Sequence, residues 1–591
     1  MSSAMPAGAS FIHTPVLTHV ILTPEKISSE QKQFYTTAHT FARDEVETRV
    51  EEIDHKKPGV LVDLMRRAAE LGLFMVSIPE EFGGLGLDKT TSMLITETMS
   101  HVGSFGVSYG GHTGIGSLPL VYYGTKAQKK KYLPKLATGE LLCAYALSEA
   151  GSGSDALGAK TLAKLSKDGK YYVLSGSKQW ITNASFADLF TVFAQVDGDQ
   201  FTAFLVERTM PGVSIGKEER KLGIRGSSTC SVILDDVHVP VENLLGEVGK
   251  GHKIAFNILN IGRLKLGAGS VGAAKNALGH GVRYAKERRQ FKKPIATFGL
   301  IREKFANAAT AIYAGESMVY RTTGIIDDRI ASLNPKAEDY SSQSIKAIEE
   351  FTVECSILKV FGSEALYMVA DEMLQIHGGN GYTEDYPLER ILRDARINRI
   401  FEGTNEINRL IIPATVLKRA LQGRLPIMDF MGQIMAELAE PAKLPQKSNH
   451  ELANEIQAVE LVKRAIVYAA SYAAQKYMED LKEKQRLLGN MAESFINVYA
   501  MDSVLARAHQ AKEERREGAD IHRALAALFC FDARPRVFQH LRRMAMMMAE
   551  GEELDALYKN LGELDQRYRV DYMGLQNKVA EHVLEKNGYV V

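Results

Sequence analysis

The stretch DEMLQIHGGNGYTEDYPLERILRDARINRIFEGTNEINRLII at residues 371–412 organises this chain. Its QIHGGNG segment predicts a helix end followed by a glycine turn. Pro387 is suited to open a short helix, because the first turn needs no proline N–H and the ring already holds a helical φ. The FEGTN segment predicts the end of that unit and the start of another helix, with Thr404 or Asn405 as its side-chain cap.

This reading puts Glu402 on a loop beside Gly403, just ahead of a helix N-terminus that can bind an anion. Local chemistry alone leaves its role open, because most glutamates are solvated surface groups.

The motif as a whole is more specific. QIHGGNGYTEDYPLERILRDARINRIFEGTNEI closely resembles the signature of the acyl-CoA dehydrogenases, and the similarity runs from about Glu30 to Leu421. In that family the glutamate of the FEGT turn is the base that removes the α-proton of an acyl-CoA. The resemblance therefore implies that Glu402 is the catalytic base of an enzyme of fatty-acid β-oxidation.

Length and composition suit a multi-unit globular protein. A chain of 591 residues is too long for one core, so two to four structural units are expected. Its 72 basic and 72 acidic residues cancel, which argues against a dedicated nucleic-acid binder. The four cysteines lack pair spacing and predict reduced, buried thiols with no metal site: Cys143, Cys230, Cys355 and Cys530.

The N-terminal residues resemble no targeting signal. No apolar run is long enough to cross a bilayer, and no arginine precedes Arg43. The segment differs from both a secretion signal and an Arg-rich mitochondrial presequence. We therefore expect a bacterial cytoplasmic protein whose residues 1–27 are an arm or disordered.

The rest of the chain predicts an α+β fold in four further parts. Residues 28–140 read as a helical N-terminal domain that begins with a capping box at Ser28. Residues 141–250 are rich in β-branched and aromatic residues with Asp-Gly and Ser-Gly turns, typical of a β-domain, which we expect to be barrel-like. Residues 251–422 return to helical periodicity and read as a four-helix bundle that carries the catalytic Glu. Residues 423–591 predict an extra all-α C-terminal domain, which resembles the extension of the family's very-long-chain branch.

The helix expected around residues 104–116 is crowded with glycine. Close helix packing would explain this, since glycine otherwise weakens a helix. The alternative is that the glycines leave space in the wall of the substrate pocket for a long acyl chain, as the family's long-chain members suggest.

The implied reaction needs a redox cofactor, because side chains cannot accept the hydride that leaves the β-carbon. The chain has no strand–GxGxxG–helix unit for a nicotinamide nucleotide. The segment YALSEAGSGSD at residues 145–155 reads locally as a strand running into a polar turn. By resemblance it lines the ring of FAD, although Ala150 replaces the family's usual proline. Its implied FAD contacts are Tyr145, Leu147, Ser148, Gly153 and Ser154, and Ser154 would also lie near the acyl-CoA phosphates.

Trp180, the only tryptophan, begins a Trp-Ile-Thr segment. A lone tryptophan is more often a core residue than a cofactor contact. By resemblance Trp180 and Ile181 pack against the isoalloxazine ring, and Thr182 bonds near its N5 atom.

A third segment, Arg288-Arg289-Gln290-Phe291, implies a cofactor shared between two chains. Basic residues after a long helix could simply cap its C-terminus. By resemblance they bind the FAD pyrophosphate of a neighbouring subunit, which implies a homodimer with FAD at its interface. Lys292 and Arg302 stand where glycine and glutamine are usual in the family. The implied contacts are Arg288, Gln290, Phe291, Phe298, Gln375, Ile376, Gly378 and Gly379.

Two effects can make a carboxylate basic enough for an α-proton. Donors at the thioester oxygen stabilise the enolate, and in the family these are the N–H of the catalytic glutamate and a flavin hydroxyl. Burial by the acyl chain raises the carboxylate's basicity. One branch of the family places its base at the position of Gly262, which here has no side chain. The remaining implied contacts are Asn260, Arg263 and Gly403 for substrate, and Thr404, Asn405 and Glu406 for FAD; Arg263 could instead form a buried salt bridge.

We therefore expect an FAD-dependent long- or very-long-chain acyl-CoA dehydrogenase that passes electrons to an electron-transfer flavoprotein. Two alternatives stay open. One is a non-catalytic assembly or scaffold protein of the same fold. The other is an acyl-CoA oxidase, which differs in the access of oxygen to the flavin.

Residues 425–438 place Ile427, Met431, Ile434 and Leu438 on one side of a predicted helix. Core packing would explain this side, and an in-plane membrane anchor is the alternative.

Overall fold

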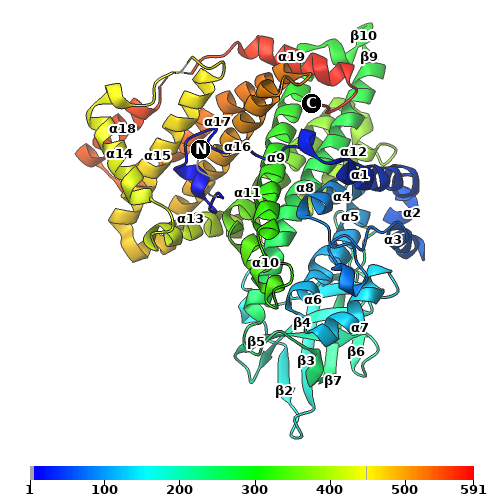
Figure 1. The fold of residues 1–591 in the computed structure, drawn as a ribbon. Coiled ribbons are helices and arrows are strands. Elements are labelled where there is room, and N and C mark those ends of the chain that lie inside the picture. Colours follow the sequence, from blue (N-terminus) through cyan, green and yellow to red (C-terminus); the bar gives the residue numbers. More distant parts are fainter. Residues whose placement is uncertain (1–4, 448, 567) are drawn as a thin grey trace.

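A mixed β-sheet lies at one end of the molecule and helices form the rest, in the computed structural model that describes residues 5–447, 449–566 and 568–591 (Figure 1). The helices that precede the sheet in the chain lie beside a set of long central helices, and the last of them lie next to the sheet. A second helical body, coloured yellow to red, packs on the other side of the central helices. The predicted α+β class, with a middle sheet and helical parts before and after it, is confirmed.

The N-terminal helices begin where the capping box predicts. The Ser28 side chain accepts the N–H of Gln31, and the Gln31 side chain bonds back to the Ser28 backbone. The glycine-rich segment is not one α-helix, because α5 (Gly103–Gly110) continues as a π-helical turn, η6 (Gly111–Gly116). The other helices here are α1 (Ser29–Phe41), α2 (Val50–Asp54), α3 (Val60–Glu70), α4 (Lys89–Met99), α6 (Leu118–Tyr123) and α7 (Lys126–Ala137).

The sheet has eight strands in the order β6-β7-β3-β2-β4-β5-β8, with β1 parallel to β4 at its side. Strand β4 is buried along its whole length, so it forms the centre of the sheet's core. The strands are β1 (Cys143–Ala146), β2 (Leu162–Leu165), β3 (Tyr171–Thr182), β4 (Leu189–Val196), β5 (Gln200–Glu207), β6 (Val213–Ile215), β7 (Thr229–Pro240) and β8 (Leu244–Leu245).

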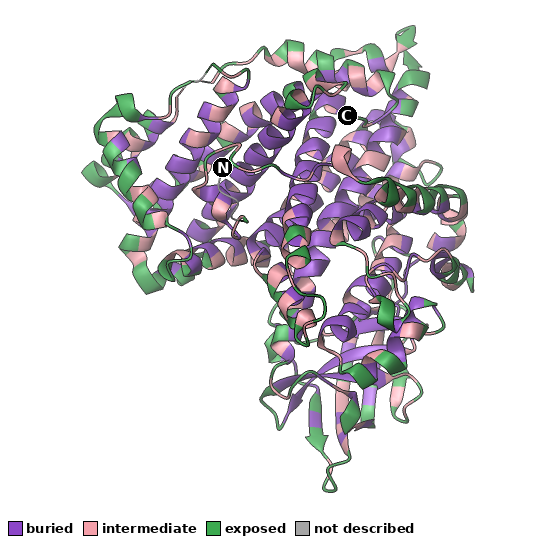
Figure 2. Cartoon of the chain, viewed as in Figure 1, coloured by how far each residue is buried: buried purple, intermediate pink, exposed green. Residues whose placement is uncertain are grey.

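The central body is built on α8 (Gly251–Glu287), whose 37 residues extend about 55 Å. It packs along α11, and α9 lies against both. Figure 2 shows these long helices buried over most of their length. The other elements are the β9–β10 hairpin (Arg289–Gln290, Lys293–Pro294), α9 (Gly299–Ala331), α10 (Tyr340–Glu349), α11 (Thr352–His377), η10 (Gly378–Tyr382), α12 (Pro387–Ala395), η11 (Arg396–Arg399) and α13 (Asn405–Leu421).

The C-terminal helices pack onto the central body through α16, which contacts α9, α13 and α17. The predicted apolar side of α14 faces inward, with Ile434 fully buried. Met428 and Met435 of the same helix are exposed. The helices are α14 (Ile427–Ala439), α15 (Ala453–Tyr477), α16 (Gln485–Glu513), α17 (Ala519–Met548), α18 (Gly551–Leu564) and α19 (Tyr572–Glu585).

Residues 5–27 form an arm that ties the two helical bodies together. The N–H of Ala9 donates to the Glu354 carboxylate at 2.6 Å, and the ring of Phe11 lies 4.6 Å from that of Tyr499. Phe11 is almost fully buried, so hydrophobic burial holds this segment in place. Residues 1–4 of the segment predicted as an arm or disordered lie outside the described residues.

Candidate active site

Glu402 sits in a strained turn between η11 and α13. As the sequence predicts, Thr404 caps α13, and its hydroxyl accepts the N–H of Ile407 at 3.2 Å. Gly403 has φ +80°, and Glu402 itself has φ +60°. A left-handed conformation costs a non-glycine residue about 1–2 kcal/mol and persists only where its surroundings enforce it.

Two side chains hold this turn through its backbone. Asn408 donates its amide to the carbonyls of Gly403 and Thr404, at 2.9 and 3.0 Å. The Arg263 guanidinium on α8 donates to the carbonyl of Glu402 at 3.2 Å. These bonds use the backbone of the turn, so the Glu402 carboxylate is left to point elsewhere.

The Glu402 carboxylate faces a cavity of about 170 Å³ between α4, α5, η6, α8 and α12. Its Oε2 atom is buried and has no hydrogen-bond partner. A Cβ at Gly262 would lie 2.4 Å from that oxygen, so the carboxylate occupies the space that the missing side chain leaves. A buried, unpaired oxygen next to a cavity is unusual in a native protein and marks a candidate catalytic group.

Burial raises the pKa of Glu402 to about 7, although the charges of Arg263 and Lys359 pull it down. Lys359 on α11 is fully buried, and its Nζ lies 2.7 Å from the Asn405 amide oxygen. Burial also lowers the pKa of Lys359 to about 7. A carboxyl group with a pKa near neutrality is suited to general-base chemistry.

Residues 145–155 are held in place by contacts with strand β3. Glu149 forms a buried ion pair with Lys178 of β3 at 2.7 Å, and it accepts the N–H groups of Lys160 and Thr161. The carbonyl of Ser148 accepts the N–H of Gln179 at 2.9 Å. This segment is therefore a fixed wall beside β3, as a cofactor site needs.

Trp180 and Thr182 extend that wall towards Glu402. Trp180 lies at a register shift between β3 and β7, has φ +57°, and is 56% exposed. Thr182, at the end of the strand, lines the same cavity as Glu402. An indole held out in a strained conformation offers a flat apolar surface on which a ring could stack. These residues fit the isoalloxazine ring of FAD.

Thr404, Asn405 and Glu406 lie next to Glu402 at the start of α13, and the other predicted FAD contacts lie at the far end of α8. Phe291 in the β9–β10 hairpin is 86% exposed, and its ring lies 6.0 Å from that of Phe298. The ring of Tyr284 lies 4.1 Å from that of His377, which joins the ends of α8 and α11. This second group comprises Arg288, Gln290, Phe291, Phe298, Gln375, Ile376, Gly378 and Gly379.

The two groups stand too far apart for one chain to enclose a dinucleotide. From Gly262, beside Glu402, to the end of α8 is about 38 Å along the helix. The hairpin projects at the opposite end from the sheet in Figure 1. A single FAD could meet both groups only if a second copy supplied one of them.

Two predicted contact residues have side chains turned into the protein. Asn405 is 1% exposed, and its amide bonds to Lys359, Ser363 and Glu364. Asn260 accepts from Arg263 at 2.9 Å and donates to Thr352. Both side chains therefore bond to neighbouring residues of the protein, and their contacts with FAD and substrate stay predictions.

No pattern in the sequence indicates several buried groups of this site. Lys359, Lys265 and the Glu149–Lys178 pair lie in segments that read as ordinary helix or strand. Only the packing of α8, α11 and β3 brings Lys265 to the cavity, Lys359 to Asn405 and Lys178 to Glu149.

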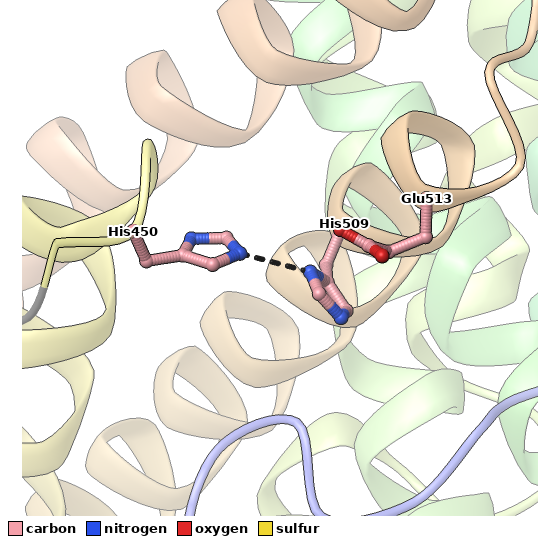
Figure 3. A group of neighbouring side chains, drawn as sticks. All are labelled: His450, His509 and Glu513. Atoms are coloured by element: carbon pink, nitrogen blue, oxygen red, sulfur yellow. Dashed lines mark hydrogen bonds between the residues drawn. The ribbon is translucent and has the colours of Figure 1, made fainter.

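One group among the described residues has the spacing of metal ligands, although the sequence predicts no metal. His450 Nε2 lies 3.1 Å from His509 Nδ1, and Glu513 follows one turn later on α16 (Figure 3). A hydrogen bond between the two imidazoles accounts for their spacing, and none of the three residues lines the Glu402 cavity.

No helix in the described part of the chain is long and apolar enough to span a membrane.

Comparison with known proteins gives matches along most of the chain. Models of the acyl-CoA dehydrogenase N-terminal and middle domains match residues 28–140 and 144–237, and two C-terminal domain models match residues 249–417 and 461–561. A probable acyl-CoA dehydrogenase of Bacillus subtilis is 45% identical over 99% of this chain and 98% of its own. Human mitochondrial very long-chain specific acyl-CoA dehydrogenase is 37% identical over 79% of this chain and 73% of its own.

A similar fold is known from experiment. The acyl-CoA dehydrogenase of Bacillus anthracis, solved in complex with FAD, matches with a TM-score of 0.96 and 45% identity, covering 99% of this chain and all of its own. Butyryl-CoA dehydrogenase of Megasphaera elsdenii matches with a TM-score of 0.61 and 34% identity, covering 66% of this chain and 99% of its own. The shorter relative thus aligns with about two-thirds of the chain.

Proposed function

This chain belongs to the acyl-CoA dehydrogenase family, and we propose that it oxidises the Cα–Cβ bond of long-chain acyl-CoA to a trans-2-enoyl-CoA in the cytoplasm of a bacterium. FAD is its cofactor, and the resemblance stated from the sequence is confirmed. The observation that supports Glu402 as the catalytic base is its buried Oε2 atom, which has no hydrogen-bond partner. The residue lines a cavity, so its carboxylate is placed to meet a substrate.

Glu402 removes the α-proton of the thioester. Its pKa of about 7 leaves it partly ionised at neutral pH and far more basic than an exposed glutamate. The backbone N–H of Glu402 is the donor to the thioester oxygen that the family resemblance implies. Bound FAD supplies the acceptor for the β-hydride. Trp180 and Thr182 orient the flavin ring, and Thr182 lines the same cavity as Glu402.

We propose a homodimer in which each FAD touches both chains. The separation of the two contact groups along α8 supports this arrangement. Phe291, Leu300 and Tyr382 are 86%, 76% and 86% exposed near the second group, and a partner chain would cover them. Arg288→Ala should lower FAD content and leave the thermal unfolding of the apoprotein unchanged, measured by flavin absorbance and calorimetry.

The preference for long chains rests on the cavity wall and the extension. Gly106, Gly110 and Gly111 line the cavity, and a Cβ at Gly110 would meet nothing within 4 Å. The glycines thus leave room for an acyl chain, although Gly106 and Gly111 also allow close packing. The extension aligns with very-long-chain relatives. A kcat/KM series over acyl-CoA lengths tests this preference, and an optimum at four carbons or fewer would refute it.

The test of the main proposal is flavin bleaching by palmitoyl-CoA without oxygen. Glu402→Gln should abolish bleaching and keep FAD bound, because the amide cannot accept the proton. Gly262→Ala should reduce bleaching at least about tenfold, because its Cβ displaces the carboxylate. Glu384→Gln, an exposed carboxylate change, is the control. Full activity of Glu402→Gln would overturn the assignment.

Electrons then leave the flavin, and we propose an electron-transfer flavoprotein as their acceptor, as the family resemblance implies. The same assay in air separates the oxidase alternative, which would release hydrogen peroxide at the rate of turnover. On α14 a membrane contact would use the exposed Met428 and Met435, since the predicted apolar face of this helix packs inward. Unchanged liposome flotation after both are replaced by serine would exclude it.

A further inference from the structure

A buried lysine stands in the wall of the cavity that Glu402 faces. Lys265 lies three residues after Gly262 on α8, so both residues are on nearly the same side of the helix. It is 8% exposed and lines the cavity together with Thr96 of α4 and Ser100, the residue that follows this helix. Its side chain passes along Gly114 of η6, where a Cβ would approach its Cδ at 3.3 Å.

Lys265 has no acidic partner among the hydrogen bonds and ion pairs of the described residues. Its Nζ lies 3.4 Å from the hydroxyl of Thr96, which donates its own proton to the carbonyl of Ser92. The charged residue that affects the pKa of Lys265 is another cation, Lys89. Burial, assisted by Lys89, lowers the pKa of Lys265 to about 7. An ammonium in such a place is costly unless an anion pairs with it.

The same wall carries further polar atoms that a purely hydrocarbon ligand would leave unpaired. The hydroxyl of Ser100 donates to the Thr96 carbonyl, which leaves its lone pairs free to accept. The hydroxyl of Ser270, also in the lining, is buried without a partner. An apolar chain gains nothing from these groups, whereas a chain with a charged end would pair with the lysine.

From this geometry we infer that Lys265 is a specificity-determining residue that binds a carboxylate at the distal end of the acyl chain. The substrate class is then ω-carboxyacyl-CoA, a dicarboxylic acid carrying one thioester. This inference rests on the proposed function, because it places the reacting thioester at Glu402 and the far end of the chain at Lys265. The chemistry at the Cα–Cβ bond is unchanged.

The pairing also selects chain length. A carboxylate that stops short of Lys265 does not reach its ammonium group, and one carried past it must fold back. The preference for the carboxylated substrate should therefore peak at one chain length and decline on both sides. For apolar acyl-CoA substrates, kcat/KM should show no such peak at that chain length.

The test compares kcat/KM for matched pairs of acyl-CoA and ω-carboxyacyl-CoA from five to sixteen carbons, in the wild type and in Lys265→Met. We expect the variant to lose at least about tenfold on the preferred ω-carboxyacyl-CoA and to keep or improve its activity on the apolar partner. Lys89→Met, which removes the neighbouring cation outside the cavity lining, should keep the preference. The melting temperature of Lys265→Met should not fall, because methionine suits the buried position better than an unpaired amine.

Three outcomes are distinguishable. A selective loss on the carboxylated series supports the inference. Equal effects of Lys265→Met on both series, or no preference for any carboxylated chain in the wild type, overturn it and leave the proposed function intact. If no acyl-CoA of either series reduces the flavin, the proposed function itself fails.

Discussion

Replacing Lys359 with methionine tests the electrostatics that set the basicity of Glu402. Lys359 is fully buried and bonds Asn405 at 2.7 Å, and methionine keeps its length while removing the charge. Burial raises the pKa of Glu402 to about 7 against the pull of Arg263 and Lys359. Loss of one of the two cations therefore raises that pKa further.

The size of the shift follows from the state of the lysine. A full positive charge within a few ångströms lowers a carboxyl pKa by about 1–3 units. Burial brings the pKa of Lys359 itself to about 7, so only about half of the molecules carry the charge at neutrality. The two groups titrate as a pair, and we expect a rise of about 0.5–1 unit, or about 1 kcal/mol.

The assay is the rate of flavin bleaching on rapid mixing with saturating acyl-CoA, measured from about pH 5 to pH 9. The base acts only when ionised, so the rate falls as the pH drops below the pKa of Glu402. On the acid side of the pH–rate profile, the limb along which the rate falls should have its midpoint near pH 7 in the wild type. In Lys359→Met the midpoint of this limb should lie about 0.5–1 pH unit higher. Lys463→Met, which removes another buried lysine beside Asp502 in the extension, should leave the limb in place. A limb that stays fixed or moves to lower pH in Lys359→Met would refute the reasoning.

Other substitutions test the backbone, the cavity and the core. Lys292 has φ +68°, so Lys292→Gly should raise the free energy of unfolding by about 1 kcal/mol, whereas Lys293→Gly should not; equal effects in urea denaturation would contradict this. Gly110→Leu fills open cavity space and should move the kcat/KM optimum to shorter acyl-CoA; an unchanged profile would show that the chain lies elsewhere. Glu316 is buried and pairs with Lys275 and with the buried Arg507, so Glu316→Gln should cost about 3–5 kcal/mol in urea denaturation. Those cations lower the pKa of Glu316 to about 2, so its contribution is present above the unfolded value near 4.5 and is lost as the pH falls towards 2; a variant with unchanged stability at pH 7 would contradict this.

The sequence alone determined the features that depend on neighbouring residues. The capping box at Ser28, the proline at the start of α12 and the Thr404 cap of α13 each use contacts within one helical turn. The sheet and the helical parts follow from side-chain periodicity, which is also local. The FEGT motif pointed to Glu402 for the same reason, because the motif is continuous in the chain.

Only the tertiary structure decided the environment of that carboxylate. Its unpaired oxygen depends on Gly262, which is 140 positions earlier in the chain, and its pKa depends on Lys359 across the bundle. The same packing turns Asn405 inward and brings Lys265 to the cavity wall, which no spacing in the sequence indicates. Charge and burial act through space, so residues far apart in the chain set the chemistry of a site whose motif lies in one short segment.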